Sequence, residues 1–467
     1  MIEMYHEFSY WISENKNYSS PVIKDIISRL KRADKILNFS HDSNYLKELS
    51  QNSEFNQLGS SIKSQIKKSV KLYNEFIEDK KIYKKSQSLL KVGSLFANIG
   101  VAEARLHEIG VDVVVANELE PRRAKLYKEI YPLTSMICGD INELSIQQRF
   151  IDECKRNEID VLMATPPCQG MSTAGKQLDD DERNQLIIPV IDIICNLKPN
   201  FAFIENVPML LNTKINMHDK EDLIISHIKN YLEQDYNISI TTINTEDYSV
   251  PQSRERVIIL LSKKTKNIFW NIPEKNKKKV TMEDAIGDIP ELDPVIKDIT
   301  REELLSIFPE FEYRRKRAEQ ISKWHRPPHH IKRQVIAMMH TPTGQTAFDN
   351  EHYYPKKADG SPVRGYRNTY KRQNWDRPAY TVTMDNRKIS SQNNVHPGRF
   401  NKETRLYSDA RVLTLYEIMK IMSLPEDWNL PDSAPEAFVR RIIGEGIPPL
   451  FVKKVFAELL KEIKNEC

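Results

Sequence analysis

The sequence has few cysteines and no long apolar run, and each shortage excludes a class of protein. Its five cysteines form no CxxC pair and no Cys/His ligand spacing, so we expect neither a disulfide framework nor a metal site. No apolar run approaches membrane-spanning length, and the N-terminal MIEMYHEFSYW lacks the basic residues and apolar core of a signal peptide. These features predict a cytoplasmic protein that contacts no membrane.

Net charge is also small, at +4 over 467 residues, of which 29% are charged and 40% hydrophobic. A chain of this length and composition can form two or three domains with buried cores. Because the excess of positive charge is slight, any surface for a polyanion must come from local clusters of basic residues.

Residues 1–88 are predicted to form a separate helical extension. Ser19 and Pro21 mark a helix start, and apolar residues recur at a spacing of three and four over 22–37 and 60–81. Both predicted helices carry basic residues on the opposite face. That face is either a solvated surface or an accessory surface that contacts phosphate groups.

From Lys91 onward, short apolar strands alternate with helices, which predicts an α/β fold with a doubly wound parallel sheet. We expect a helix over 101–110, ended by Gly110, between the first two strands. Glu118 ends the second strand, where an acid can hydrogen-bond a ribose, although a surface acid is the simpler alternative. Asp140 follows a third strand and is placed to accept a hydrogen bond from an adenine amino group.

Another apolar strand leads into ATPPCQGMS at 164–172, whose two prolines stiffen the chain. Cys168 is therefore expected on a loop at the carboxyl edge of the sheet, where a thiol can face a ligand. The alternative is that Cys168 is a small buried side chain. A polar stretch over 175–184 follows, which is either a mobile lid or a helix start at which Arg183 forms a salt bridge.

The apolar run 201–204 ends in Glu205, at the predicted rim of a desolvated pocket, where a carboxyl group can act as a general acid. A helix cap or an ordinary ion pair is the alternative for this glutamate. Arg254 and Arg256 alternate just before a further buried strand. They are either structural pairs or place a guanidinium in the pocket to hold a planar substrate through its oxygen.

Basic, aromatic and proline residues gather over 263–394, a composition typical of a surface that follows phosphates and contacts bases. The adjacent His329 and His330 have no partners at metal spacing, so we interpret them as surface residues. After residue 394 amphipathic helices return.

Eight motifs occur in one order between residues 91 and 465: SLFANIG, ANELEP, GDI, TPPCQG, IENV, PQSRERV, RVLT and GEGIPP. With these motifs the sequence resembles the DNA (cytosine-5)-methyltransferases. The resemblance implies a Rossmann-like, S-adenosylmethionine-dependent methyltransferase with a small target-recognition domain. It divides the chain into a helical extension (1–88), a catalytic domain (89–262), a target-recognition domain (263–394) and C-terminal helices returning to the catalytic domain (395–467).

The resemblance also implies a role for individual residues. Cys168 matches the nucleophile that adds to carbon 6 of cytosine, Glu205 the acid at ring nitrogen 3, and Arg256 the arginine at oxygen 2. Arg254 belongs to the same catalytic group and supports the loop of Arg256. The positions that match the cofactor pocket are Phe96, Gly100, Glu118, Asp140, Ile141 and Pro166. The positions that match DNA contacts are Gln169, Ser172, Arg183 and Thr381.

The implied activity is methyl transfer from S-adenosylmethionine to carbon 5 of a flipped cytosine in a specific duplex DNA sequence. We expect a monomer that protects DNA from a partner restriction endonuclease. Methylation of tRNA is an alternative with the same chemistry, which the size of the 263–394 region disfavours. A DNA-binding regulator with an inactive catalytic fold is another, which the presence of Cys168, Glu205 and Arg256 disfavours.

The sequence departs from the family pattern at four positions. Ser94 replaces the usual aspartate of the cofactor motif, Asn98 and Val101 replace glycines, and Glu445 replaces the asparagine of the GNxxPP motif. None of these positions carries a group that makes or breaks a bond.

Overall fold

The computed structural model forms two compact units, residues 1–89 with 131–133, and residues 90–130 with 134–467. The structure describes residues 8–9, 11–12, 16, 18–37, 45–167, 182–350, 353, 356–357, 359–361, 369–387, 389 and 393–466.

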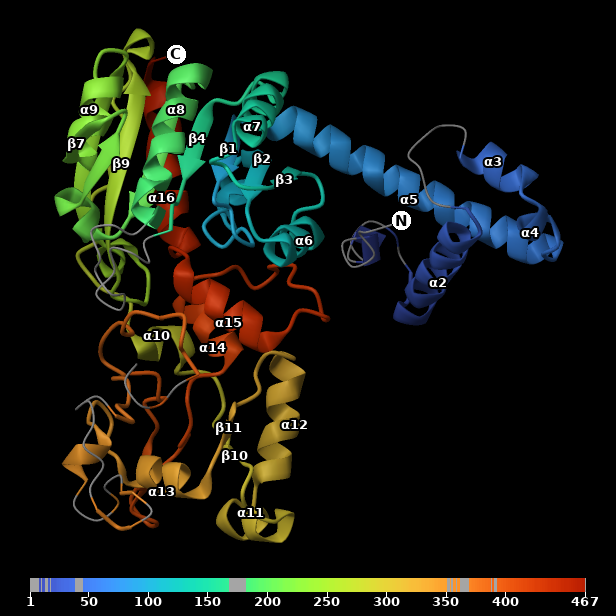
Figure 1. Cartoon of the computed structure of the whole chain (residues 1–467). Coiled ribbons are helices and arrows are strands. Elements are labelled where there is room, and N and C mark those ends of the chain that lie inside the picture. The colour runs from blue at the N-terminus through green and yellow to red at the C-terminus, as the bar shows by residue number, and fades with distance from the viewer. Residues whose placement is uncertain are drawn as a thin grey trace. The chain divides into compact units, whose positions relative to one another are not determined.

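The first unit consists of helices in its described part. Leu30 of the first long helix and Val70 and Phe76 of the last one are buried in a common core. Phe8 joins that core edge-on to Tyr73, with ring centroids 5.0 Å apart. The described helices are α2 (Ser20–Ile36), α3 (Tyr45–Gln51), α4 (Ser53–Asn56) and α5 (Ser60–Gln87), drawn in blue in Figure 1.

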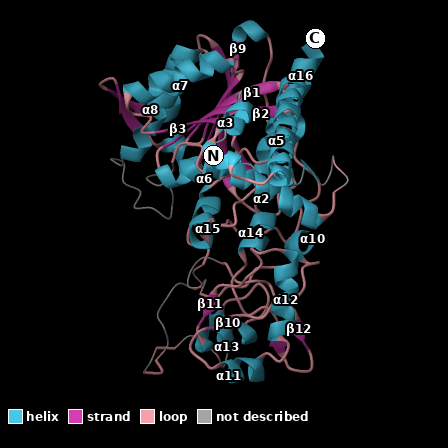
Figure 2. Cartoon of the chain, turned by 90° about the vertical axis from the view of Figure 1, so that its right-hand side faces the viewer, coloured by secondary structure: helices cyan, strands magenta, loops and turns pink. Residues whose placement is uncertain are grey.

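A seven-stranded sheet organises the second unit, and Figure 2 shows its strands between helices. The strand order is β3-β2-β1-β4-β5-β9-β8, with β1 to β5 parallel and β9 antiparallel to both of its neighbours. The strands are β1 (Leu90–Leu95), β2 (Val111–Glu118), β3 (Ser135–Cys138), β4 (Val161–Ala164), β5 (Phe201–Asn206), β8 (Tyr236–Asn244) and β9 (Glu255–Lys263). The order reverses between β1 and β4, and open α/β sheets bind ligands at such a switch point.

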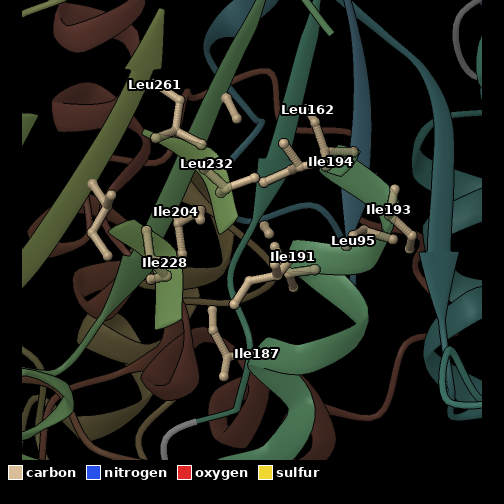
Figure 3. Packing of buried hydrophobic residues seen from close by; sticks show 14 of the residues in the cluster. Leu95, Leu162, Ile187, Ile191, Ile193, Ile194, Ile204, Ile228, Leu232 and Leu261 are labelled. Atoms are coloured by element: carbon tan, nitrogen blue, oxygen red, sulfur yellow. The ribbon is translucent and has the colours of Figure 1, made fainter. Parts of the chain in front are cut away.

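Alternate residues of these strands face two separate helical layers, as a doubly wound sheet requires. On one face, Leu162 and Ile204 of the sheet pack against Ile191 of α8 and Ile228 of α9 (Figure 3). The layer comprises α7 (Leu144–Asn157), α8 (Ile187–Leu197) and α9 (Ile224–Leu232). The predicted doubly wound α/β fold is confirmed.

The long C-terminal helix α16 (Pro449–Glu466) covers the other face of the sheet and lies behind the strands in Figure 1. Phe456 of this helix packs on Phe203 of β5, with ring centroids 5.9 Å apart. Trp270 is buried beside both rings and donates its indole N–H to the carbonyl of Val455 at 2.9 Å.

The helix predicted over 101–110 is wrong. Turns occupy the first part of this segment, and only a short 3₁₀ helix, Leu106–Ile109, follows before Gly110 at φ 75°. Tertiary contacts override helical propensity here. The side chain of Glu103 turns inward to Ser94, and the Nε of Arg105 donates to the carbonyl of Ser423 at 2.6 Å.

A second core lies in the part of this unit that follows the sheet. Leu304, Phe311, Val335, Met338 and Val412 are buried in it. The remaining elements are α6 (Pro121–Ile130), β6 (Lys214–Met217), β7 (Lys220–Leu223), α10 (Met282–Ile286), β10 (Val295–Ile296), α11 (Arg301–Ile307), α12 (Phe311–Ile321), β11 (His329–His330), α13 (Lys332–His340), β12 (Phe400–Asn401), β13 (Leu406–Tyr407), α14 (Leu415–Ile421) and α15 (Glu436–Glu445).

A buried cluster of charges ties this core to α14. Arg411 is 0% exposed and donates to both carboxylate oxygens of Glu417, at 2.9 and 2.8 Å, and to Asp409 at 2.7 Å. His330 is buried nearby, where its Nε2 accepts the N–H of Val412 and burial lowers its pKa to about 4. The prediction that His330 lies at the surface is therefore wrong, because the sequence gives no sign of the packed neighbours.

Candidate active site

The described start of the loop after β4, residues 165–167, is held between the ends of two neighbouring strands. Asn206 at the end of β5 donates its amide N–H to the carbonyl of Pro166 at 3.1 Å and accepts the N–H of Val207 at 2.8 Å. On the other side, the N–H of Thr165 donates to the carbonyl of Leu95 in β1 at 3.4 Å. The segment before Cys168 therefore starts at the carboxyl edge of the sheet, next to the switch point.

The predicted nucleophile and two predicted DNA contacts, Cys168, Gln169 and Ser172, lie outside the described residues. Arg183, the next predicted DNA contact, is exposed in a short 3₁₀ helix, Glu182–Leu186, that leads into α8.

An ion pair occupies the carboxyl edge of the sheet beside this loop. Glu205 on β5 and Arg256 on β9 lie on adjacent antiparallel strands, and their Oε1 and Nε atoms are 2.6 Å apart. Each side chain is 10% exposed. A second guanidinium nitrogen of Arg256 donates to the carbonyl of Glu255 at 2.7 Å, which fixes the plane of the group. A carboxyl and a guanidinium held side by side can engage neighbouring polar atoms of one planar ring.

Arg254 and Thr381 take part in a junction between the sheet and the segments that follow it. Arg254 is 2% exposed and donates to the carbonyls of Val382 at 2.9 Å and Gly444 at 3.0 Å. The hydroxyl of Thr381 donates to the carbonyl of Ser253 at 2.7 Å. In the structure both side chains thus hold backbone segments together, which is the structural alternative stated for Arg254 and a role that the sequence did not indicate for Thr381.

The predicted cofactor residues lie at or just beyond the carboxyl ends of four adjacent strands. Phe96 and Gly100 lie in the turns after β1 and have positive φ angles, of 57° and 77°. Asp140 accepts the N–H of Asn142 at 2.9 Å. The full set of predicted cofactor residues is Phe96 and Gly100 after β1, Glu118 in β2, Asp140 and Ile141 after β3, and Pro166 after β4.

Glu118 is the most constrained of these side chains. It is 6% exposed, and its two carboxylate oxygens accept the backbone N–H of Glu120 and of Asn98, each at 2.9 Å. Burial raises the pKa of Glu118, while the two N–H groups and the charge of Arg123 counteract part of that rise. The carboxylate is therefore oriented by the backbone, and its remaining lone pairs can accept hydrogen bonds from hydroxyl groups.

Comparison with known proteins identifies the family. The model of the C-5 cytosine-specific DNA methylase family matches residues 90–461. The chain belongs to that family. It is therefore a DNA cytosine-5 methyltransferase, and the resemblance stated from the motifs is confirmed.

Individual relatives of this methyltransferase match most of the chain. The type II methyltransferase M1.HgaI of Avibacterium volantium is 41% identical over 378 residues, which cover 79% of this chain and 98% of that protein. The type II methyltransferase M.NgoPII of Neisseria gonorrhoeae is 24% identical over 392 residues, covering 80% and 97%.

Among solved structures, a prophage-encoded protein of E. coli described as a DNA modification methyltransferase aligns with a TM-score of 0.56. It is 19% identical and covers 80% of this chain and 99% of its own. The methyltransferase EhMeth of Entamoeba histolytica aligns with a TM-score of 0.50, at 14% identity and with coverage of 80% and 98%. These structures show the shared fold.

Sequence reasoning missed the partners of Glu118 in this methyltransferase. Arg123 was one of several basic residues in a helix, and no local pattern distinguished it. Asn98 and Glu445 were visible as departures from the family pattern, which was the available signal. In the described part of the chain, no cluster of three or more His, Cys, Asp or Glu side chains could hold a metal ion. None of the described helices is long and apolar enough to cross a membrane.

Proposed function

We propose that this methyltransferase transfers a methyl group from S-adenosylmethionine to carbon 5 of a cytosine that is flipped out of a specific duplex sequence. We further propose that it modifies DNA as the protective partner of a restriction endonuclease. The type II relative M1.HgaI, which is matched over 98% of its length at 41% identity, supports this partner. The observation that carries the proposal is the buried Glu205–Arg256 pair at the carboxyl edge of the sheet.

Carbon 5 of cytosine needs activation because it is a poor nucleophile in the aromatic ring. In the proposal, the thiolate of Cys168 adds to carbon 6, and the ring becomes an enamine whose carbon 5 is nucleophilic. S-adenosylmethionine, when bound, supplies an electrophilic methyl group. Carbon 5 then loses its proton to solvent and nitrogen 3 returns its proton to Glu205, so that the electron pair of the C–H bond restores the double bond of the ring and expels the Cys168 thiolate.

Glu205 and Arg256 are proposed to make the addition possible by acting on the other side of the ring. A proton held by Glu205 at ring nitrogen 3 takes up the negative charge that develops as the thiolate adds. Arg256 donates an N–H to oxygen 2, because a guanidinium offers N–H donors in a fixed plane and has no acceptor. Arg254 is proposed to support the segment that carries Arg256, because its guanidinium binds the backbone carbonyls of Val382 and Gly444.

The residues around Glu118 fit S-adenosylmethionine by their chemistry. The Oδ1 atom of Asn98 is buried and has no hydrogen-bond partner among the described residues, so an acceptor is left for a ligand donor. The cofactor offers hydroxyl, ammonium and amino donors. We assign Glu118 to the ribose hydroxyls and Asp140 to the adenine amine, with Phe96, Gly100, Ile141 and Pro166 forming the rest of the pocket.

DNA is proposed to bind through the 263–394 region and the loop of Cys168. The contacts carried over from the family are Gln169, Ser172, Arg183 and Thr381. A base inside a duplex cannot reach a buried ion pair, so the cytosine has to leave the stack before Glu205 can contact it. The pairing energy lost in that step is a few kcal/mol and has to be recovered by contacts to the flipped base.

Transfer of radiolabelled methyl groups from S-adenosylmethionine to genomic DNA tests this assignment. Glu205→Gln removes the acid but keeps the shape, and we expect the single-turnover rate to fall by a factor of about 100 or more. DNA binding should stay within about twofold of wild type, because the change lies at the flipped base alone. The exposed neighbour Glu255 provides a matched control, and Glu255→Gln should leave the rate unchanged.

Two results would count against the proposal. If Glu205→Gln methylates DNA as fast as Glu255→Gln, the acid is not at this position. If the wild-type protein transfers methyl groups to tRNA and not to DNA, the substrate is wrong while the chemistry stands.

A further inference from the structure

Two of the departures from the family pattern, Asn98 and Glu445, contact each other, although they belong to two motifs far apart in the chain. The side-chain amide of Asn98 donates to Glu445 at 3.3 Å, across 347 residues of sequence. Beside this contact, a Cβ added to Gly446 would lie 2.9 Å from a methyl carbon of Val101. The two motifs thus lie against each other at these positions, and the contact of Asn98 with Glu445 is polar.

Backbone geometry explains why an asparagine is tolerated in the place of a glycine. Asn98 has a φ of 55°, in the left-handed region, where glycine is unstrained and asparagine is tolerated better than most residues. This tolerance permits Asn98 but does not require it. The amide of Asn98 donates a hydrogen bond to Glu445, which a glycine at this position could not do.

Arg123 holds the carboxylate of Glu445 in place. Its two terminal nitrogens donate to Oε2 and Oε1 of Glu445, at 2.8 and 3.2 Å, which is a bidentate pair. The Nε of Arg123 donates to Glu120 at 2.8 Å. The side chains of Arg123 and Glu445 are 19% and 16% exposed, so solvent screens this pair less than an ordinary surface ion pair.

These contacts close into a ring of five residues, which we call the Glu118 ring. Glu118 accepts the N–H of Asn98 and of Glu120; Asn98 binds Glu445, Glu445 binds Arg123, and Arg123 binds Glu120. The two backbone N–H groups that orient Glu118 therefore belong to residues whose side chains are linked through Arg123 and Glu445. Removing the Glu445 carboxylate releases the side chain of Asn98, while the N–H of Glu120 still donates to Glu118.

We propose that Glu445, held by Arg123, is a positioning residue for the cofactor. It anchors the side chain of Asn98, and so fixes both the N–H that orients Glu118 and the buried Oδ1, which accepts no hydrogen bond from the described residues. The inference rests on the proposed function, because it takes the pocket of Glu118 as the cofactor site. Glu445 itself touches no reacting atom.

Variants that restore the usual family residue test this role. Glu445→Asn removes the carboxylate, and Asn98→Gly removes the anchored side chain while keeping a residue that is unstrained at φ 55°. We measure the Kd of S-adenosylhomocysteine by titration calorimetry. Each variant should bind it about five to ten times more weakly, the size expected for losing one charge-assisted hydrogen bond in a partly exposed site. Combining the two should weaken binding no further than the worse single variant, because both remove the same contact.

Two controls separate positioning from structure. Arg441 also approaches Glu445, at 3.8 Å, but its side chain is 62% exposed and is not part of the Glu118 ring, so Arg441→Gln should bind within about twofold of wild type. Glu445→Gln keeps one acceptor oxygen and should recover part of the lost affinity. In methyl transfer to genomic DNA, the KM for S-adenosylmethionine should rise in Glu445→Asn while kcat stays within about twofold.

The possible results distinguish the two proposals. Wild-type affinity for S-adenosylhomocysteine in Glu445→Asn and Asn98→Gly would overturn the positioning role and leave the proposed function intact. Losses that multiply in the double variant, or a kcat that falls with no change in KM, would overturn it as well. If wild-type protein fails to bind S-adenosylhomocysteine, the cofactor site of the proposed function falls, and the positioning role falls with it.

Discussion

Replacing Glu103 by glutamine should change the pH dependence of stability in a defined window. Glu103 lies in the turns after β1 and is 3% exposed. Ser94 donates its hydroxyl to one carboxylate oxygen at 2.5 Å, and Tyr127 donates its hydroxyl to the other. Burial raises the pKa of Glu103 from 4.5 to about 7, although the two hydroxyl groups counteract part of the rise. Glu103 thus supplies a carboxyl group next to Ser94, where the family pattern has an aspartate.

The direction in which the free energy of unfolding changes with pH depends on which state binds the Glu103 proton more tightly. The folded state binds the Glu103 proton more tightly than the unfolded chain, so its contribution to stability is complete below pH 4.5 and is lost as the pH rises to about 7. One pKa unit corresponds to about 1.4 kcal/mol, which gives a total loss of about 3 kcal/mol. Between pH 5 and pH 8 the loss is about 2.5 kcal/mol, because part of the change occurs below pH 5.

Chemical denaturation of wild type and Glu103→Gln at pH 5 and pH 8 measures this loss. Glutamine stays neutral and can still bond both hydroxyl groups, each of which donates or accepts. The free energy of unfolding of the variant, relative to wild type, should therefore rise by about 2.5 kcal/mol from pH 5 to pH 8. Glu143→Gln, at an exposed position, should show no such rise. A difference for Glu103→Gln that does not change with pH would refute the reasoning, because the carboxyl group would then not titrate in this window.

Three further perturbations have outcomes that the structure specifies. Arg411→Met leaves the buried Glu417 without its partner, and thermal denaturation should show a loss of about 3–5 kcal/mol; an unchanged Tm would contradict the buried pair. Gly444→Ala places a Cβ 2.2 Å from the carbonyl oxygen of Thr383, so the same assay should show a loss of about 1–3 kcal/mol, and wild-type stability would mean that the backbone moves freely there. Deleting residues 1–88 should weaken DNA binding more at low salt than at high salt, as fluorescence anisotropy can measure, and equal affinity at low salt would exclude a phosphate-contacting role.

The fold could be predicted from the sequence where one physical signal dominated. Short apolar runs followed by polar residues gave the strands of the sheet; Glu118 ends β2, and Glu205 is the last residue but one of β5. The parallel arrangement brings such ends to one edge, so the place of both acids followed from topology alone. The predicted reaction came from the order of the eight motifs, because neither composition nor residue spacing indicates cytosine chemistry.

The sequence could not reveal contacts made by tertiary packing. Glu103 sits in a segment with helical periodicity, and only the fold turns its side chain inward to Ser94 and Tyr127. The pairing of Arg123 with Glu445 joins residues separated by 322 positions, and no local pattern links them. His330 was placed at the surface for the same reason. The division of the chain into four domains stays a prediction.

Methylation sequencing of genomic DNA incubated with the purified protein and S-adenosylmethionine tests the central claim most directly, with Cys168→Ala in parallel. The account predicts 5-methylcytosine at one position of one short sequence motif with the wild-type protein, and none with the variant. Methylation that persists in Cys168→Ala, or that is absent from DNA treated with the wild-type protein, would contradict it.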